Sequence, residues 1–290
     1  LQVYQDQATG PQSRKDIIST IFIPPWSFLI VAPFAILNYP LSRLAWLIFS
    51  IIILINSAEL LWKVYDGPSQ KKWLSWIFVF LYFPTIYLLE DGQTTCLVLL
   101  GLAAFLYFER LHRYWLGGTF IALITIKPQL TFLFWPAIVL WSIKRKNFSV
   151  CFGSALAILL ASILMIIINP QIFEQYFSHI RFNSPVLWGT PTIGGYLRYF
   201  FLGVENFWPQ YIGPSLGAIW FILYWSKKNQ HWDWASESPI LSFMSVLTSL
   251  YGWSYDQVVL QVGIIKAGCH LTQFQKKVSW TLMAVYFFMN

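Results

Sequence analysis

Residues 148–168 read FSVCFGSALAILLASILMIII, a stretch of 21 residues without one charged side chain. A helix needs about 20 residues to cross the ~30 Å hydrocarbon core of a bilayer. Backbone in lipid has to be helical, because lipid offers no hydrogen-bond partners. The stretch therefore predicts a membrane-spanning helix.

Similar apolar stretches fill most of the chain. They lie at residues 40–62, 73–89, 93–109, 113–126, 128–143, 208–225, 239–251, 256–271 and 278–290. A further stretch, 24–37, is too short to span easily and predicts a re-entrant or interfacial helix. With one span per long stretch, the predicted fold class is all-α, a polytopic integral membrane protein with about 9–10 transmembrane helices.

The composition excludes the other common classes of protein. Of the 290 residues 57% are apolar and 11% are charged, against about 25% charged in a soluble domain. The three cysteines, Cys96, Cys151 and Cys269, lie in apolar stretches, which excludes a secreted disulfide scaffold. The net charge of +7 is scattered between the apolar stretches. We therefore expect a lipid bilayer, and no nucleic acid, as a partner.

Five clusters of basic residues fall in alternate loops of this pattern. They are Lys63/Lys71/Lys72, Arg110/Arg113, Lys144/Arg145/Lys146, Lys227/Lys228 and Lys276/Lys277. If each long stretch crosses once, all five lie on one side, and the positive-inside rule makes that side cytoplasmic. The extracytoplasmic side then carries the other polar segments, including a long outer loop at 169–207.

Glu90, Asp91 and Gln93 are the first candidate substrate-binding residues, at a tip between two predicted spans. Adjacent carboxylates are costly there unless they are solvated or paired, and the Gln93 amide can both donate and accept hydrogen bonds. Gly92 allows a tight turn or the close approach of a ligand. An ordinary solvated turn with Asp91 near the N-cap of the next helix explains the same residues, and both interpretations stay open.

Lys127 and Gln129 are the second candidate pair. Between Arg113 and Lys144 the chain has to cross the membrane outward and return, so each arm reaches only about 23 Å at 1.5 Å per residue. This length is short of the ~30 Å hydrocarbon core. Lys127 is therefore predicted to lie below the outer headgroups, where a charged residue is a functional candidate. Its ammonium can neutralise a phosphate. The alternative is a lysine that snorkels to the headgroups.

Two later outer segments carry the remaining candidates. Trp253 and Tyr255 offer rings for the apolar faces of a sugar, and Asp256 offers a carboxylate for its hydroxyls, although interfacial Trp and Tyr occur in any membrane protein. In the outer loop, Arg181 and Arg198 are suited to hold a phosphate; solvation of the outer surface is the alternative.

We expect no metal and no cofactor. The four histidines lack metal-ligand spacing. The sequence has no Gly-rich phosphate-binding loop, and it has no Ser, His and Asp in an order typical of a catalytic triad.

At these residues the chain resembles glycosyltransferase family 87, membrane mannosyltransferase-like proteins with the GT-C fold. The stretch Ile23-Pro24-Pro25-Trp26, followed by Leu44-Ala45-Trp46, is similar to an early motif of that family. Three later segments resemble its motifs in the same order, namely Gly92-Gln93, Gly117-Gly118 through Lys127-Pro128-Gln129, and Leu250 to Gln257. The four matches cover most of residues 20 to 260.

The resemblance implies a hexosyltransferase of the bacterial plasma membrane with an extracytoplasmic active face. Such an enzyme moves a mannose-like hexose from a polyprenyl-phosphate carrier to a glycan or glycolipid acceptor. The family's catalytic base is a carboxylate in the first outer loop, upstream of the Pro-Pro-Trp segment. We therefore expect the base before Leu1, a chain truncated at its N-terminus, residues 1–23 as a remnant of that loop, and residues 24–290 as a single helical transmembrane domain.

The alternative function is a transporter or flippase of a lipid or small solute. A transporter places charged groups near the bilayer midplane and uses broken helices there. The candidate residues of this chain are predicted near the outer surface, and the stretches 40–62 and 148–168 have uncharged middles. The sequence therefore favours the enzyme.

Overall fold

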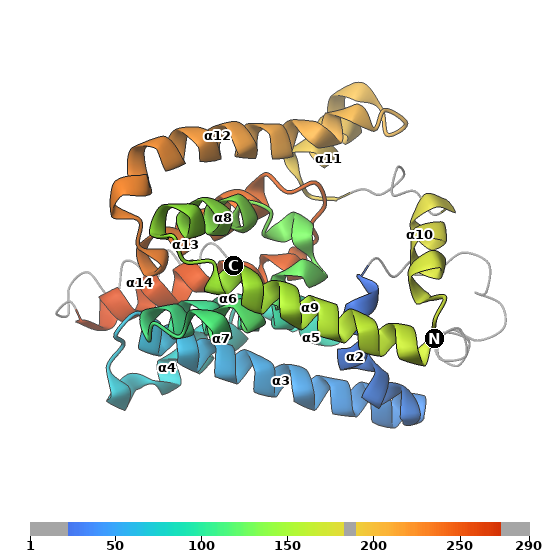
Figure 1. The fold of residues 1–290 in the computed structure, drawn as a ribbon, viewed down its shortest axis with the longest axis horizontal. Helices are drawn as coiled ribbons and strands as arrows, with labels where there is room; N and C mark the ends of the chain where they lie inside the picture. Colours follow the sequence, from blue (N-terminus) through green and yellow to red (C-terminus); the bar gives the residue numbers. More distant parts are fainter. Residues whose placement is uncertain (1–22, 183–189, 274–290) are drawn as a thin grey trace.

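The computed structural model describes residues 23–182 and 190–273, and the regular elements in these ranges are helices (Figure 1). The α-helices are α2 (Phe28–Val31), α3 (Tyr39–Val64), α4 (Trp73–Phe80), α5 (Phe83–Glu90), α6 (Thr95–Arg110), α7 (Tyr114–Ile121), α8 (Phe134–Arg145), α9 (Ser149–Ile168), α10 (Ile172–Phe182), α11 (Ile193–Leu197), α12 (Ile212–Lys228), α13 (Trp234–Leu247) and α14 (Gln261–Gln273). The short 3₁₀-helices are η1 (Pro25–Ser27), η2 (Ala32–Ile36), η3 (Ser69–Lys71), η4 (Ala122–Ile126), η5 (Pro128–Leu130), η8 (Trp208–Tyr211), η9 (Asn229–His231) and η10 (Ser254–Leu260), and η7 (Arg198–Leu202) is a π-helix.

The all-α membrane fold predicted from the sequence is confirmed. Within the described residues, α3 and α9 are long and apolar enough to cross a bilayer. A third crossing is possible for the pair formed by Ser69–Phe80 and α5, which is bent by 66°. Most of the other predicted spans fold as shorter or broken helices, and residues 278–290 lie outside the described ranges.

Proline explains the bend between α4 and α5. Pro84 lies in the first turn of α5 and has no N–H to donate, and a proline ring clashes with the carbonyl four residues earlier in a continuous helix. The helix therefore ends at Phe80, and Tyr82 adopts an extended conformation before α5 begins. The stretch 24–37 likewise contains only the short helices η1, α2 and η2, as expected for a segment too short to span.

Helix α6 forms the centre of the fold. From Thr95 to Leu106 every residue except Leu100 is buried. Figure 1 shows α3 and α12 at opposite edges of the molecule with α6 between them, and α3 and α7 pack along α6.

Small residues bring α7 and α9 into close contact. A Cβ added at Gly118 would fall on the backbone carbonyl of Val150, and one at Gly153 would fall on that of Trp115. Close approach of backbones through small residues is typical of helix pairs in membranes, where lipid provides no hydrophobic force between them. The glycine stretch that precedes Lys127 is therefore a packing surface.

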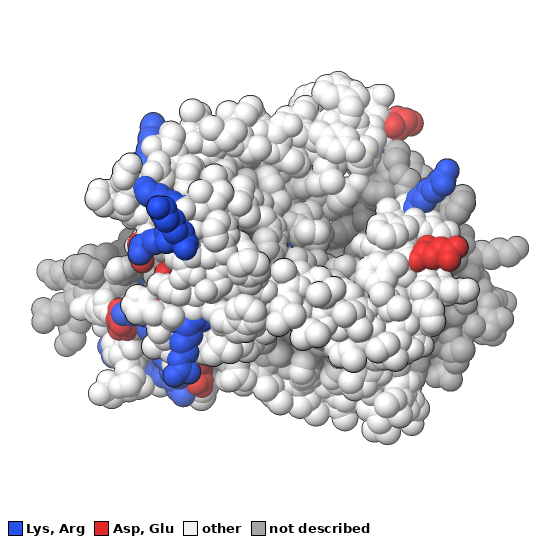
Figure 2. Space-filling view, viewed as in Figure 1, with Lys and Arg blue, Asp and Glu red and all other residues white. Residues whose placement is uncertain are grey.

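The basic clusters gather at one end of the molecule (Figure 2). Arg110, at the end of α6, donates to the backbone carbonyl of Lys63 at the end of α3. The Lys144 ammonium, at the end of α8, donates to the side chain of Asn229 just after α12, at 2.8 Å. The predicted grouping of the basic loops is thus confirmed for the described clusters, and Lys276 and Lys277 lie outside the described ranges.

The packing of α7 on α9 generates a testable prediction. Gly118→Val places methyl groups against a backbone carbonyl that cannot move independently, and overpacking of this kind costs about 1–3 kcal/mol. Thr119→Val is the matched control, because Thr119 is the exposed neighbour in the same helix. We expect the midpoint of thermal unfolding in detergent to fall for Gly118→Val and to stay near the parent value for Thr119→Val. Equal midpoints would contradict the close contact.

Candidate functional site

A fully buried carboxylate, Asp256, forms the centre of the candidate site. Its Oδ1 accepts hydrogen bonds from the Lys127 ammonium and from the Thr95 hydroxyl, each at 2.7 Å. Its Oδ2 accepts from the backbone N–H of Trp253 at 3.1 Å, which caps the start of η10. The side chain is 0% exposed. A buried charge is tolerated when it is paired and hydrogen-bonded, and Asp256 satisfies both conditions.

Lys127 reaches this carboxylate from the break between η4 and η5. The residue before a proline is kept out of the helical conformation, and Lys127 has φ −132° and ψ 73° ahead of Pro128. Its ammonium also donates to the Gln93 side-chain oxygen at 3.2 Å and lies 4.7 Å from the centre of the Tyr255 ring. The residue is 9% exposed. Lys127 is thus buried inside the protein, and the snorkelling alternative does not describe it.

A turn at Gly92 brings Gln93 to the same point. Gly92 has φ +62°, a conformation that favours glycine. Its carbonyl accepts a hydrogen bond at 2.8 Å from the indole of Trp46, which is seven residues beyond the start of α3. At 1.5 Å per residue the backbone of Trp46 lies about 10 Å from that end of α3, and its indole reaches the turn. This end is opposite to the one that carries Lys63.

The carboxylates of Glu90 and Asp91 are exposed beside this turn. Their exposure agrees with the solvated-turn interpretation, although Asp91 is the C-cap of α5, and the N-cap of α6 is Thr94. Gly92 separates the two helices and lets the chain turn first. Burial raises the pKa of the Tyr255 hydroxyl, and the charges of Asp256 and Asp91 raise it further, so the hydroxyl stays protonated.

Trp253 and Tyr255 form an aromatic pair, and the Lys127 ammonium lies against the Tyr255 ring. Their rings are nearly parallel, with an angle of 11° and 6.1 Å between their centres. Both side chains are half-buried, whereas Asp256 next to them is fully buried. Both rings are therefore partly exposed to a ligand, and Asp256 holds Lys127 against the ring of Tyr255.

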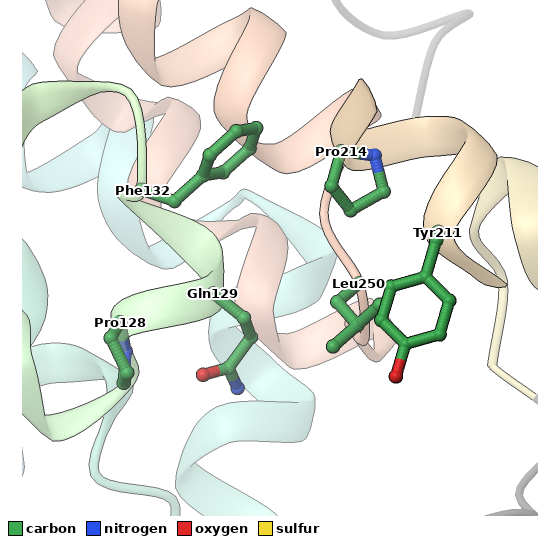
Figure 3. A pocket seen from close by; sticks show the side chains of 6 residues that line it. All are labelled: Pro128, Gln129, Phe132, Tyr211, Pro214 and Leu250. Carbon is green, nitrogen blue, oxygen red and sulfur yellow. The ribbon is translucent and has the colours of Figure 1, made fainter. Parts of the chain in front are cut away.

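The structure does not bring Arg181 to this cluster. Arg181 lies in the last turn of α10, where it lines a separate hollow with Glu174, Phe177 and Ser178. Gln129 lies in η5, two residues from Lys127, and lines an apolar cavity (Figure 3). Arg181 therefore lies apart from the Lys127–Asp256 cluster.

Arg198 is turned into the protein. It is 2% exposed and donates to the side-chain oxygen of Gln210 at 3.3 Å. The Gln210 amide donates in turn to Thr192 at 3.0 Å and to the carbonyl of Leu250. This network fixes the outer segment 190–211 to the chain just before Trp253.

Thr95 is the site residue that the sequence did not reveal. Its hydroxyl binds Asp256 across 161 positions of the chain. A threonine in the first turn of an apolar helix has no feature that separates it from others, and only its place two residues after Gln93 was a signal. Among the described residues no three His, Cys, Asp or Glu side chains come together as a metal site would require.

Comparison with known proteins gives one match. The family model of glycosyltransferase family 87 matches residues 22–249, which include Gln93, Thr95 and Lys127. No curated protein and no solved structure matches the chain.

The buried ion pair generates a prediction on stability. Lys127→Met leaves the Asp256 carboxylate buried without a counter-charge, and breaking a buried pair in this way costs about 3–5 kcal/mol. Adding Asp256→Asn removes the stranded charge and keeps the acceptor for Thr95. We therefore expect the midpoint temperature of thermal unfolding in detergent to be much lower for Lys127→Met than for the parent. In the double variant this midpoint should return most of the way to the parent value.

Lys72→Met is the control for this experiment. Lys72 pairs with Glu59 at 2.9 Å with 40% of its side chain exposed, and exposed pairs contribute about 0–1 kcal/mol. If Lys127→Met were no less stable than Lys72→Met, or if Asp256→Asn lowered stability further, the buried pair would not have the structural role described.

Proposed function

Because the chain belongs to glycosyltransferase family 87, we propose that it moves a mannose-like hexose from a polyprenyl-phosphate carrier to a glycan or glycolipid acceptor. We assign the reaction to the extracytoplasmic face of a bacterial plasma membrane. The observation that carries the proposal is the buried ammonium of Lys127, held by Asp256 and Gln93 beside the half-buried ring of Tyr255. A buried ammonium of this kind is suited to pair with the phosphate of a membrane-anchored donor.

The hydrogen bonds of Lys127 support the proposal that its ammonium binds the phosphate of the donor. An ammonium has three N–H donors, and the described residues provide two acceptors, on Asp256 and Gln93. A phosphate oxygen that enters beside Tyr255 takes the third donor. When the bond from the anomeric carbon to the phosphate breaks, the charge that develops on the leaving oxygen is stabilised by this preorganised donor.

The rings of Trp253 and Tyr255 support the proposal that a sugar binds next to that phosphate. The half-buried rings of Trp253 and Tyr255 suit the apolar C–H face of a hexose, and the exposed carboxylates of Glu90 and Asp91 can accept hydrogen bonds from its hydroxyl groups. Asp256 takes a different role from the one expected from the sequence, because a fully buried and hydrogen-bonded carboxylate positions Lys127 and does not contact the sugar. In this proposal the general base is a carboxylate upstream of Pro24.

The broken helices around Lys127 are also a feature of transporters. They are the one structural observation that favours a flippase as the second candidate function. The family match favours glycosyl transfer instead, and the breaks then serve to bring Gln93 and Lys127 to one point.

The donor class is tested with purified full-length protein freed of endogenous lipid donors. We expect sugar transfer from a polyprenyl-phosphate sugar and none from a nucleotide sugar. Lys127→Met with Asp256→Asn should lose about 2–4 kcal/mol of transition-state stabilisation, which is roughly a thirtyfold to thousandfold loss of rate. Turnover of a nucleotide sugar would refute the donor class, and a folded double variant within threefold of the parent would refute the phosphate role of Lys127.

The face of the reaction is tested by cysteine labelling in intact cells, in a variant without the native cysteines. Asp91→Cys and Ser254→Cys lie at exposed positions of the site, whereas Gln70→Cys and Gln230→Cys lie at exposed positions near the basic clusters. An impermeant thiol reagent should label the first two and spare the second two until the cells are opened. The reverse pattern would place the site on the cytoplasmic side.

A further inference from the structure

Residues 196–202, which read YLRYFFL, form an exposed segment that we call the aromatic arm. It consists of the end of α11 and the π-helix η7. Tyr199, Phe200 and Phe201 are 72%, 65% and 78% exposed, and Tyr196 is exposed as well. The rings form one continuous group, since neighbouring ring centres lie 5.1, 6.2 and 6.4 Å apart. An exposed apolar group of this kind indicates a surface that contacts a partner or a membrane.

The one charged side chain of the aromatic arm is turned inward. Arg198 is buried, and its guanidinium donates to the side chain of Gln210 and to the carbonyl of Val204. It also lies 5.3 Å from the centre of the Phe207 ring. A segment surrounded by water normally places its charge outside and its rings inside. The aromatic arm does the reverse, which indicates apolar surroundings.

The length of α12 gives the level at which the aromatic arm lies. Lys227 and Lys228 end α12 next to the basic residue Lys144, which binds Asn229. At the other end of α12, η8 leads directly into Ile212. With rises of 1.5 Å per residue in α12 and ~2 Å in η8, the two helices together span about 33 Å. This length is close to the ~30 Å hydrocarbon core of a bilayer.

The aromatic arm therefore lies about one core thickness from the basic end. Helix α11 packs against η8, and Figures 1 and 2 show α11 toward the right of the molecule and the basic clusters at its left. In η8 itself, Trp208 and Tyr211 are exposed. Exposed Trp and Tyr are typical of the level where lipid tails meet headgroups.

We propose that the aromatic arm inserts into the boundary between headgroups and tails of the lipid leaflet opposite the basic clusters. Phe200 and Phe201, which have no polar atom, then reach the tails, and the hydroxyls of Tyr196 and Tyr199 stay near the headgroups. This inference goes beyond the proposed function, because it concerns the contact with the bilayer and is independent of the donor and the reaction.

Buried hydrogen bonds connect this anchor to the candidate site. Arg198 donates to the side-chain oxygen of Gln210, and the Gln210 amide donates to the carbonyl of Leu250. Leu250 lies three residues before Trp253, which belongs to the aromatic pair. Insertion of the aromatic arm thus fixes the level of this segment relative to the lipid.

Fluorescence quenching tests where the aromatic arm lies. In a variant without the native cysteines, a bimane label is attached at Phe201→Cys or, as the matched control, at Glu205→Cys, an exposed charged position four residues later. The full-length protein is placed in phosphatidylglycerol vesicles that contain a lipid with a nitroxide near the start of its acyl chain. We expect this lipid to quench the label at 201 several-fold more than the label at 205. Aqueous iodide should show the opposite preference.

A second experiment tests whether the rings hold the arm in lipid. The label is moved to Tyr199→Cys, and Phe200 and Phe201 are both replaced by Asp. Carboxylates are costly in contact with lipid tails, so we expect lipid quenching to fall several-fold and iodide quenching to rise. Phe200→Leu with Phe201→Leu is the control, because it keeps the surface apolar and should retain the parent's quenching.

Two results of the first experiment would overturn the inference. If iodide quenches the labels at 201 and 205 equally and the nitroxide lipid quenches neither, the aromatic arm lies in water. If the label at 201 is protected from both quenchers, protein covers the arm, as in contact with a second copy of the chain. In the second experiment, unchanged quenching in the Asp pair would contradict the role of the rings. The first experiment is decisive even where the Asp pair does not fold, and none of these results depends on sugar transfer.

Discussion

The buried ion pair between Lys127 and Asp256 is the constraint on which the part of the fold around η5 and η10 depends. Neither charge is tolerable alone at such low exposure, so the segment before η5 and the start of η10 have to meet although 129 positions separate them. Thr95 and Gln93 complete the hydrogen bonds and bring in the turn between α5 and α6. Three segments are thereby held in a single arrangement.

Broken helices make this arrangement possible, and their exposed backbone has to find partners. Non-helical backbone is tolerated at membrane depth where protein covers it. The Trp46 indole binds the carbonyl of Gly92, and the Thr131 hydroxyl binds that of Ile124 at 3.3 Å. The breaks that shorten the predicted spans are therefore also what allows polar side chains to enter the core.

The result is a site with two kinds of wall. One wall carries the ammonium of Lys127 against the ring of Tyr255, which stacks with Trp253, and the other is the apolar cavity that begins at Pro128. The first wall is the one that meets the phosphate and the sugar of the proposed lipid-linked donor.

The sequence by itself determined the all-α membrane fold and the grouping of the basic residues, because both follow from composition and from the spacing of apolar stretches. It also singled out Gln93, Lys127 and Asp256, since polar residues are conspicuous where few charges occur. Only the tertiary structure decided that they form one cluster, that Asp256 positions Lys127, that Thr95 joins them and that Arg181 stays apart. Contacts across 34, 129 and 161 positions leave no local pattern, because they arise from how helices with glycine and proline breaks pack against one another.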